Sequence, residues 1–424
     1  MADPKVAFYG DDFTGSVDAL LQFARRGWTG RLFVGVPTPG ALSSAADRHD
    51  VVGIAGIARS LPTDQLEAEV RPALEALAAL GAQVVQYKAC STADSSPTIG
   101  SLGRVIELGQ EIVSPGTVPV LFAQPDFGRY TVFGHHFAAE DGAIHRLDRQ
   151  PTMSTHPSTP MSESDLAMHL RGQTTLPIGS IPLTDYRRPP ALPSRLRDSS
   201  DAAVVLDALT DDDLTLVGEA VLSLERPVFA IGSGGLSHGM AAAAPQAGYA
   251  IPTAATLTGP VLAVSGSRSP QTRRQIEAAR RAGWLVIPLP LDEPGRMDAS
   301  VAVVAALHAG RSVALHTDSA TVTDTFGPSA LAAIATAAAA VIVSALGAAA
   351  TRRLIVCGGD TSSRVVGLLG VESLSISANP WANVVLLRAH SADPALDQVE
   401  LLLKGGQVGS VDLFESLRTF PQSA

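Results

Sequence analysis

The chain has 424 residues, of which 46% are hydrophobic and 17% charged, and its formal net charge at pH 7 is −10. This length exceeds the roughly 250–300 residues at which single cores stop growing, so it predicts two domains. The negative charge argues against a general nucleic-acid binder, which needs a basic face to neutralise phosphates. It remains compatible with a small anionic ligand held by a few local cations.

Neither a signal peptide nor a membrane span is predicted, and we expect a cytoplasmic protein. The N-terminus lacks a charged region followed by an apolar one. No stretch approaches the ~18 consecutive apolar residues that are needed to span a membrane. The alanine-rich run 330–350 comes closest, and we expect it to be a buried helix of a soluble protein. Cys90 and Cys357 have no neighbours at metal-ligand spacing, so reduced thiols are expected rather than a disulfide or a nucleophile.

Apolar, strand-like runs alternate with helical patterns along the first part of the chain. Strands are predicted at 5–10, 51–57, 83–89, 118–123, 179–183, 202–207 and 227–232, and helices at 15–27, 63–80, 100–112, 211–224 and 235–247. This alternation is typical of a parallel sheet built from crossover units. Between them, 129–148 is predicted to be an antiparallel hairpin that joins 130–133 to 143–146, and 149–162 a loop.

A second alternating series follows a Pro- and Thr-rich stretch, 251–260, which is predicted to be a linker. Its predicted strands are 261–264, 284–289, 312–317 and 353–357, and its predicted helices are 271–282, 298–309 and 328–349. The sequence therefore predicts two α/β domains with mainly parallel sheets, residues 1–250 and 258–418, with a cleft between them.

The first predicted strand ends in the turn Asp11-Asp12-Phe13-Thr14-Gly15. Open α/β folds bind their ligands at the carboxyl edge of the sheet, so chemistry is expected at this turn. A helix cap by Asp12 or Thr14 is the alternative interpretation, because both residue types are preferred N-caps. One cap accounts for one of these residues, not for both carboxylates.

Two cations, Arg59 and Lys88, also follow apolar strands and are expected to reach the same rim. Arginine can bind a carboxylate bidentately and aspartate can accept a hydroxyl proton, which suits a small, hydroxylated anion. If Arg59 or Lys88 is considered by itself, the simpler interpretation is a solvent-exposed charge at the end of a strand. Four histidines (His135, His136, His145 and His156) lack a metal-ligand spacing, so no protein metal site is predicted, although His135 or His136 could reach the substrate.

Three glycine- or serine-rich turns follow strands in the second domain, at 264–270, 357–363 and 404–410. Glycine lets backbone N–H groups approach an anion, and a following helix N-terminus favours phosphate. None of them matches GxxxxGK[ST] or GxGxxG, and each alone is an ordinary tight turn. Three such turns in one domain indicate nucleotide binding. A fourth turn, 232–238, either lines the cleft or only ends a strand.

Taken in order, these motifs resemble those of the four-carbon acid sugar kinases. The family's xxDDxTGxxD pattern is similar to residues 10–15 with Asp18, its SGS turn to 265–267, its GGETS turn to 358–362 and its KSGNFG turn to 404–409. The resemblance extends from about residue 5 to 410. It implies a sugar-acid-binding N-terminal domain and a nucleotide-binding C-terminal domain, with ATP phosphorylating a terminal hydroxyl of a short sugar acid. We further expect Mg²⁺ to accompany ATP as a cofactor.

The resemblance also implies site residues. On the substrate side they are Asp11, Arg59, Lys88, Ala89, Cys90 and Ser91. On the nucleotide side they are Ser265, Ser267, Gly358, Gly359, Asp360, Thr361, Gly405, Gly406, Gln407, Val408 and Gly409. Asp12 is expected to accept the hydroxyl proton and Asp11 to bind substrate hydroxyls, with the two roles open to exchange.

One loop departs from the family pattern. Where the family has K-x-D-S-T-x-R-G-N, residues 88–96 carry Cys90 in place of the acid and Asp94 in place of the arginine. Changed charges discriminate strongly between substrates. The changed charges disfavour threonate and erythronate, which stay as the alternative. The chain more closely resembles a branch of the family that acts on 3-oxo sugar acids, so the resemblance implies a 3-oxo acid such as 3-oxo-isoapionate or 3-oxo-tetronate.

Two other classes compete with a kinase. A dinucleotide-dependent oxidoreductase is disfavoured by the missing GxGxxG, and a non-catalytic sugar-acid sensor is left open by the altered loop. The expected partners are ATP and a small sugar acid, without nucleic acid or membrane. A homo-oligomer stays open.

Overall fold

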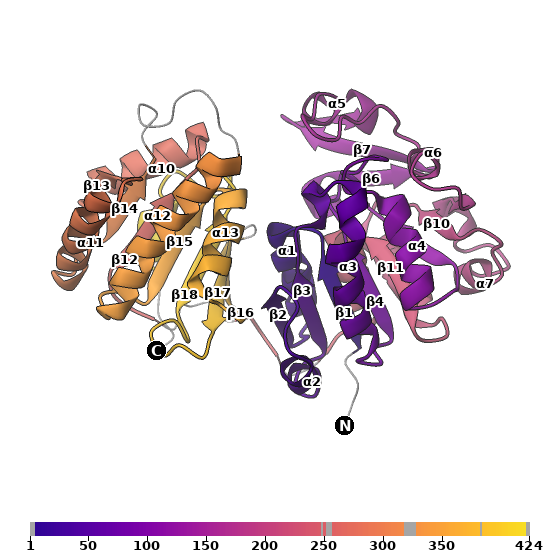
Figure 1. Ribbon diagram of the computed structural model, residues 1–424. Coiled ribbons are helices and arrows are strands. Elements are labelled where there is room, and N and C mark those ends of the chain that lie inside the picture. Colours follow the sequence, from indigo (N-terminus) through magenta and orange to yellow (C-terminus); the bar gives the residue numbers. More distant parts are fainter. Residues whose placement is uncertain (1–4, 247–248, 252–256, 318–327, 382–383, 421–424) are drawn as a thin grey trace. The chain divides into compact units, whose positions relative to one another are not determined.

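The computed structural model describes residues 5–246, 249–251, 257–317, 328–381 and 384–420. The chain forms two compact units, residues 1–250 and 251–424, each built around a sheet with helices beside it (Figure 1). The predicted fold class, two α/β domains with mainly parallel sheets, is confirmed. Residues 252–256 of the predicted linker lie outside the described residues.

The strands of the main sheet in the first unit run parallel, in the order β2-β3-β1-β4-β11-β5-β10-β9. Their bounds are β1 (Val6–Gly10), β2 (Gly30–Val34), β3 (Val51–Ala55), β4 (Val84–Lys88), β5 (Val118–Leu121), β9 (Ile178–Ile181), β10 (Ala203–Leu206) and β11 (Val228–Gly232). Strand β2 was not predicted, because only the last three of its residues, Leu32–Val34, are apolar.

Helices cover both faces of this sheet. They are α1 (Phe13–Ala24), α2 (Pro39–Ala46), α3 (Thr63–Ala78), α4 (Leu102–Ile112), α5 (Pro151–Ser154), α6 (Leu166–Arg171), α7 (Leu192–Arg197), α8 (Asp211–Leu222) and α9 (Gly234–Ala243), with short 3₁₀ turns at Ala58–Ser60, Pro125–Phe127, Leu147–Arg149 and Leu183–Asp185. On one face Phe8 of β1 stacks on Phe23 of α1, with ring centroids 6.5 Å apart. On the other face Ala7 and Tyr9 join the core that includes Leu66 of α3. Because both faces are buried, the polar groups that follow these strands lie at the edge of the sheet.

The prediction for 129–148 was wrong in detail. This segment forms a three-stranded antiparallel sheet, β6 (Arg129–Val132), β7 (His135–Glu140) and β8 (Ala143–Arg146), and β7 pairs with both of its neighbours. The connections are two-residue turns, Phe133-Gly134 and Asp141-Gly142, and all four residues have positive φ. Such turns match the twist of a hairpin and reverse the chain twice. The predicted loop 149–162 contains helix α5.

The second unit has a mixed sheet in the order β13-β14-β12-β15-β18-β17-β16. Its strands are β12 (Val261–Ser265), β13 (Leu285–Pro288), β14 (Val313–His316), β15 (Arg353–Cys357), β16 (Ser373–Trp381), β17 (Val384–His390) and β18 (Glu400–Lys404). Strands β13, β14, β12, β15 and β18 run parallel to one another. Strand β17 is antiparallel to both β16 and β18. The antiparallel pair β16–β17 was not predicted.

The helices of this unit are α10 (Pro270–Arg281), α11 (Glu293–His308), α12 (Pro328–Gly347), α13 (Gly359–Leu369) and α14 (Leu413–Arg418). Helix α12 contains the alanine-rich run. Of the described residues, one helix, Ala330–Gly347, is long and apolar enough to cross a membrane by length and composition, and half of that window is buried in the fold. Its Ile334 and Val341 are fully buried, and α12 packs against α11 and α13. Helix α12 therefore contributes to the core of the second unit.

Candidate active site

The parallel register brings separate segments of the first unit to one edge of its sheet. Gly10, the last residue of β1, is level with Ala55 of β3 and with Lys88 of β4. Backbone hydrogen bonds continue beyond the strands, because Asp11 donates its N–H to the carbonyl of Lys88 at 3.0 Å and Arg59 donates its N–H to the carbonyl of Asp11 at 3.1 Å. The two aspartates, Arg59 and Lys88 therefore lie together at the carboxyl edge.

Arg59 binds both carboxylates at once. Its Nη2 and Nε donate to the two oxygens of Asp11 at 2.7 and 3.3 Å, and its Nη1 donates to Oδ2 of Asp12 at 2.9 Å. Arginine suits this role because its donors form a rigid fork that matches carboxylate geometry. The alternative of a solvated strand-end charge does not describe Arg59, whose side chain is 24% exposed.

The two aspartates differ in environment. Asp11 has a side chain that is 3% exposed, and burial raises the pKa of its carboxyl group against the opposing effect of Arg59. Asp12 is 31% exposed and is also the N-cap of α1, where its Oδ1 accepts the N–H of Gly15 at 2.7 Å. The helix-cap interpretation is thus correct for Asp12, and the same carboxylate binds Arg59 as well.

Lys88 is almost completely buried, with 3% of its side chain exposed. Its Nζ donates to the carbonyl of Ala89 at 3.0 Å and lies 4.0 Å from Oδ2 of Asp18. The same oxygen of Asp18 accepts a hydrogen bond from Nε2 of Gln124 at 3.2 Å. Sequence reasoning placed Asp18 in the family motif without assigning it to the site, and it did not identify Gln124, which follows β5 without any local motif.

The fourth glycine turn contributes to this edge. Gly232 of β11 is level with Lys88, and Ser233 caps helix α9. A Cβ atom on Gly234 would lie 2.1 Å from Oδ2 of Asp18, so a larger residue at this position would displace that carboxylate.

The segment 88–96, which we call the substrate loop, joins its two unusual residues through a shared hydroxyl. Thr92 donates its Oγ1–H to Oδ1 of Asp94 at 2.6 Å, and Sγ of Cys90 lies 3.0 Å from Thr92 Oγ1. Since the threonine proton is used on Asp94, the Cys90 thiol is the donor in the second bond. Burial raises the pKa of Cys90 to about 11, so the group is a neutral thiol at pH 7. Ala89 and Ser91 lie in the same loop.

The three glycine turns of the second unit also meet at one edge. Ser265 of β12, Cys357 of β15 and Lys404 of β18 are level with one another. Gly266 donates its N–H to the carbonyl of Cys357 at 3.1 Å, and Gly358 donates to that of Lys404 at 2.9 Å. The turns that follow the three strands are therefore adjacent.

Close backbone packing explains the small residues in these turns. A Cβ on Gly266 would lie 2.4 Å from Oγ1 of Thr361, and one on Gly406 would lie 2.7 Å from Oγ of Ser267. Gly358 has φ +112°, which L side chains rarely adopt. By contrast, a Cβ on Gly359, at the start of α13, would meet nothing within 4 Å. A ligand approaching Gly359 would thus meet bare backbone.

Serine hydroxyls build the entry to helix α10. Ser265 Oγ accepts the N–H of Ser267, Ser267 Oγ accepts that of Ser269, and Ser269 caps the helix, each at 3.2 Å. The last turn is attached to the same helix, because Gln271 Nε2 donates to the carbonyl of Gly409 at 2.6 Å. The exposed side of this edge is a helix N-terminus beside glycine backbone, which favours anions.

The remaining predicted nucleotide residues lie in these turns. Gly405, Gln407 and Val408 belong to the turn after β18, where Val408 donates its N–H to the carbonyl of Gly405 at 3.2 Å. Asp360 lies in the first turn of α13. Sequence reasoning did not assign Lys404 itself, which is 2% exposed and donates Nζ–H to Thr272 Oγ1 at 3.0 Å. Burial lowers the pKa of Lys404.

The two histidines of β7 form hydrogen bonds within the protein. His136 is buried, and its Nε2 bonds to the carbonyl of Ser91. Nδ1 of His135 lies 3.1 Å from Oγ of Ser164. Within the part of the chain that the structure describes, no group of three or more His, Cys, Asp or Glu side chains could hold a metal ion.

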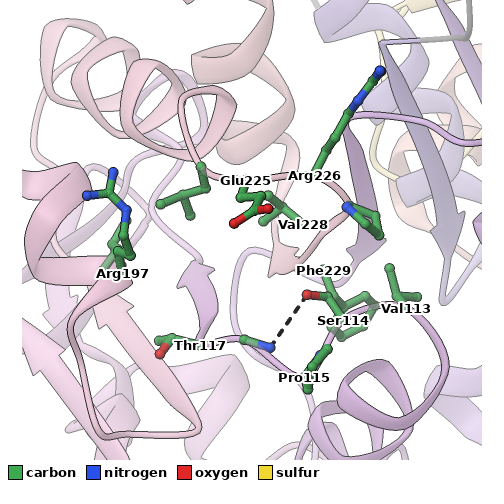
Figure 2. Close-up of a pocket in the computed structure, with 13 residues that line it drawn as sticks. Val113, Ser114, Pro115, Thr117, Arg197, Glu225, Arg226, Val228 and Phe229 are labelled. Atoms are coloured by element: carbon green, nitrogen blue, oxygen red, sulfur yellow. Dashed lines mark hydrogen bonds between the residues drawn. The ribbon is translucent and has the colours of Figure 1, made fainter.

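A pocket of about 430 Å³ lies elsewhere in the first unit (Figure 2). It is bordered by Thr117, just before β5, and by Val228 and Phe229 at the start of β11, so it lies at the amino edge of the sheet. Its arginines, Arg197 and Arg226, extend on different sides of the view (Figure 2). A ligand site usually has convergent polar groups, and the carboxyl edge fits that description better.

Comparison with known proteins identifies both units. Residues 6–240 match a family model described as a sugar-binding N-terminal domain, and residues 262–414 match one described as a nucleotide-binding C-terminal domain. The chain is 38% identical to a 3-oxo-isoapionate kinase of Paraburkholderia graminis, over 97% of this chain and 94% of that protein. It is 31% identical to a 3-oxo-tetronate kinase of Methylobacterium radiotolerans, over 95% of this chain and 96% of that protein.

Among solved structures, the fold is similar to that of a Salmonella typhimurium LT2 protein provisionally described as a tRNA synthase. The TM-score is 0.80 at 25% identity, and the match covers 98% of both chains. This similarity supports the two-domain α/β fold.

A sugar-binding domain joined to a nucleotide-binding domain, each with polar groups at the carboxyl edge of its sheet, defines a kinase that acts on a sugar derivative. The chain belongs to the four-carbon acid sugar kinase family. As a member of that family it is an ATP-dependent sugar-acid kinase, and the hypothesis of a dinucleotide-dependent oxidoreductase is rejected.

Gly15 provides a test of the carboxylate cluster. A Cβ at this position would lie 2.4 Å from Oδ1 of Asp12 and 3.0 Å from Nζ of Lys88. Gly15→Ala must therefore displace a carboxylate that Arg59 and the helix cap hold in place. We expect kcat/KM for the acceptor substrate to fall about 100-fold, because small misplacements in an active site are costly.

The matched control is Gly40→Ala in helix α2, where a Cβ meets nothing within 4 Å. It should leave activity unchanged and raise the melting temperature slightly, because alanine favours helix. Equal kinetics for the two variants would contradict a role for this cluster in the reaction.

Proposed function

We propose that this protein transfers the γ-phosphoryl group of ATP to a terminal hydroxyl of a short 3-oxo sugar acid. The observation that carries the proposal is the 38% identity, over nearly the full chain, to a 3-oxo-isoapionate kinase. Our first choice of substrate is therefore 3-oxo-isoapionate, followed by 3-oxo-tetronate. Threonate and erythronate are the less favoured alternative. Residues 88–96 differ from the loop that would be expected to bind those acids.

The carboxyl edge of the first unit is the proposed sugar-acid site. Its groups are Asp11, Asp12, Arg59 and Lys88, with Ala89, Cys90 and Ser91 of the substrate loop. The site combines two carboxylates, which can accept hydroxyl protons, with two cations, which can attract an acid. Its neutral Cys90 thiol adds no charge beside Arg59, so the balance differs from that of a loop with an acid at this position.

The row of turns in the second unit is the proposed site for ATP. Its groups are Ser265, Ser267, Gly358, Gly359, Asp360, Thr361 and the turn from Gly405 to Gly409. Backbone N–H groups and a helix N-terminus suit phosphate oxygens, and Lys404 places a cation beneath the turns.

We assign proton acceptance to Asp12 and substrate orientation to Asp11 with Arg59. Asp12 retains an exposed fraction of 31%, whereas the oxygens of Asp11 are occupied by Arg59 and almost completely buried. A hydroxyl hydrogen-bonded to Asp12 would pass its proton to this carboxylate as its oxygen bonds to the γ-phosphorus and the bond to the bridging oxygen breaks, which releases ADP. The rest of catalysis is positioning and charge neutralisation.

Magnesium fits this scheme as a partner of ATP. Mg²⁺ is usually held by one or two carboxylates together with substrate phosphates, so a dedicated cluster of protein ligands is not needed. When bound with ATP, it would neutralise part of the negative charge that develops on the phosphates during transfer. We expect the enzyme to act in the cytoplasm, and a homo-oligomer is compatible with this function.

Replacing Asp12 tests its role as proton acceptor. Asparagine caps helices as well as aspartate does, so Asp12→Asn removes the charge while keeping the cap. We expect kcat to fall by ~10² or more, with the melting temperature close to that of the wild type. Steady-state kinetics by coupled ADP detection measures this.

The control is Asp292→Asn, which changes the N-cap of α11, where Asp292 Oδ1 accepts the N–H of Gly295. Its kcat should be that of the wild type. Near-normal turnover by Asp12→Asn would assign the proton to another group, with Asp11 the next candidate.

Gly359 tests the nucleotide site without disturbing the fold. Because its Cβ would enter open space, Gly359→Ala should fold normally. The added methyl group would obstruct phosphates that approach the start of α13, so we expect KM for ATP to rise about tenfold while KM for the sugar acid stays constant. Gly367→Ala, in the same helix with equally open space, is the control. An unchanged KM for ATP in Gly359→Ala would show that the phosphates do not bind at this turn.

A substrate screen tests the assignment of the acid. ADP release should be fastest with 3-oxo-isoapionate or 3-oxo-tetronate, and kcat/KM should be at least about tenfold lower with threonate and erythronate, because mismatched polar groups discriminate strongly. A higher kcat/KM for threonate would reject the 3-oxo assignment. Binding of these acids without ADP release under any condition would favour the sugar-acid sensor.

A further inference from the structure

The substrate loop is held by contacts that no motif in it predicts. Two histidines bond to it from the segment that follows β5: His136 on β7 bonds near its start, and His169 on α6 bonds near its end. Both lie outside the residues assigned above to the sugar acid or to ATP. Their contacts identify what keeps this loop in its conformation.

The hydrogen-bonding state of His136 follows from its two neighbours. Its Nε2 lies 2.8 Å from the carbonyl oxygen of Ser91, which can only accept, so Nε2 carries the hydrogen. Burial lowers the pKa of His136 to about 3, so the ring is neutral at pH 7 and Nδ1 must be an acceptor. The hydroxyl of Thr131, 2.9 Å away, supplies that hydrogen bond. With the side chain fully buried, both ring nitrogens are used and the ring has one orientation.

His169 bonds near the other end of the loop. Its Nε2 lies 2.9 Å from Oγ of Ser95, which also donates to the carbonyl of Ala93 at 2.9 Å. Ala93 has φ +52°, a left-handed conformation that costs an alanine free energy and needs support from its surroundings. Gln173 completes the attachment, since its Nε2 donates to Ser95 Oγ at 2.9 Å and its Oε1 accepts the N–H of Leu102 at the start of α4.

We propose that His136 and His169 are positioning residues that fix the substrate loop and thereby set the affinity of the enzyme for its sugar acid. They do so without touching the acid. This inference rests on the proposed function for the meaning of the loop, but the contacts themselves do not depend on it. Loss of His136 removes the side-chain partner of the Ser91 carbonyl, and loss of His169 removes one of the three hydrogen bonds of the Ser95 hydroxyl. Either loss favours other loop conformations.

Kinetics of His136 variants test the proposal. His136→Leu removes the hydrogen bond to Ser91, whereas His136→Gln places an amide N–H where Nε2 was. We expect His136→Leu and His169→Leu to raise KM for the sugar acid about tenfold, with kcat less affected and KM for ATP unchanged. His136→Gln should restore KM to within about threefold of the wild type.

His156→Leu is the matched control. His156 lies between β7 and α6, the two elements that carry His136 and His169, but it bonds to Thr159, outside the substrate loop. Both KM values should stay at the wild-type level in this variant. The proposal is overturned if His136→Leu and His169→Leu fold normally with an unchanged KM for the sugar acid, or if KM for ATP rises equally.

Hydrogen exchange of the ligand-free protein provides a readout that needs no substrate. In His136→Leu, the backbone amides of residues 89–99 should exchange at least about tenfold faster, while those of β1 and α1 stay as protected as in the wild type. Unchanged exchange in the loop would overturn the positioning role. If no sugar acid is phosphorylated by the wild type but the loop exchange still changes, the proposed function fails and the structural part of this inference stands.

Discussion

The parallel register of the strands is the constraint on which both candidate sites depend. In the first unit Gly10, Ala55 and Lys88 are level, and in the second Ser265, Cys357 and Lys404 are level. Since helices cover both faces of a parallel sheet, polar groups gather where the strands end. Segments that are tens or hundreds of residues apart in sequence thereby become neighbours.

The carboxyl edges of the two sheets differ in the polar groups that they carry and in how charge is balanced there. In the first unit, burial of Asp11 would be costly without the Arg59 guanidinium that bonds to both of its oxygens, and Asp12 shares that cation while capping α1. In the second unit the turns combine backbone groups with serine hydroxyls, and glycines such as Gly266 and Gly406 let the turns approach one another closely. The first arrangement suits recognition of a hydroxylated acid, and the second suits phosphates.

The substrate loop carries Cys90 and Asp94, the two residues that differ from the family pattern given above. The structure couples the two departures, because Cys90 and Asp94 both bond to the hydroxyl of Thr92. A thiol that remains protonated and a carboxylate that accepts from threonine form a self-consistent set. The loop is thus an ordered alternative to the family pattern, with its conformation supported from β7 and α6.

The sequence by itself determined the α/β class, most strands of both sheets and the turns that follow them. These features are local, since the alternation of apolar runs and the small residues at strand ends can be read without knowing the pairing. For the same reason, the family motifs identified the Asp11-Asp12 turn, Arg59 and the three glycine turns. The doubled hairpin at 129–148 was missed, although Asp141-Gly142 is a local turn signal.

Only the tertiary structure decided which strands are neighbours. It thereby decided that Arg59 bonds to both aspartates and that Asp18 lies near Lys88 and bonds to Gln124. It also decided that the buried His136 bonds to the carbonyl of Ser91 in the substrate loop. These contacts join residues far apart in the chain and carry no periodicity or motif. They exist because strand order and burial bring their atoms together, which no local pattern encodes.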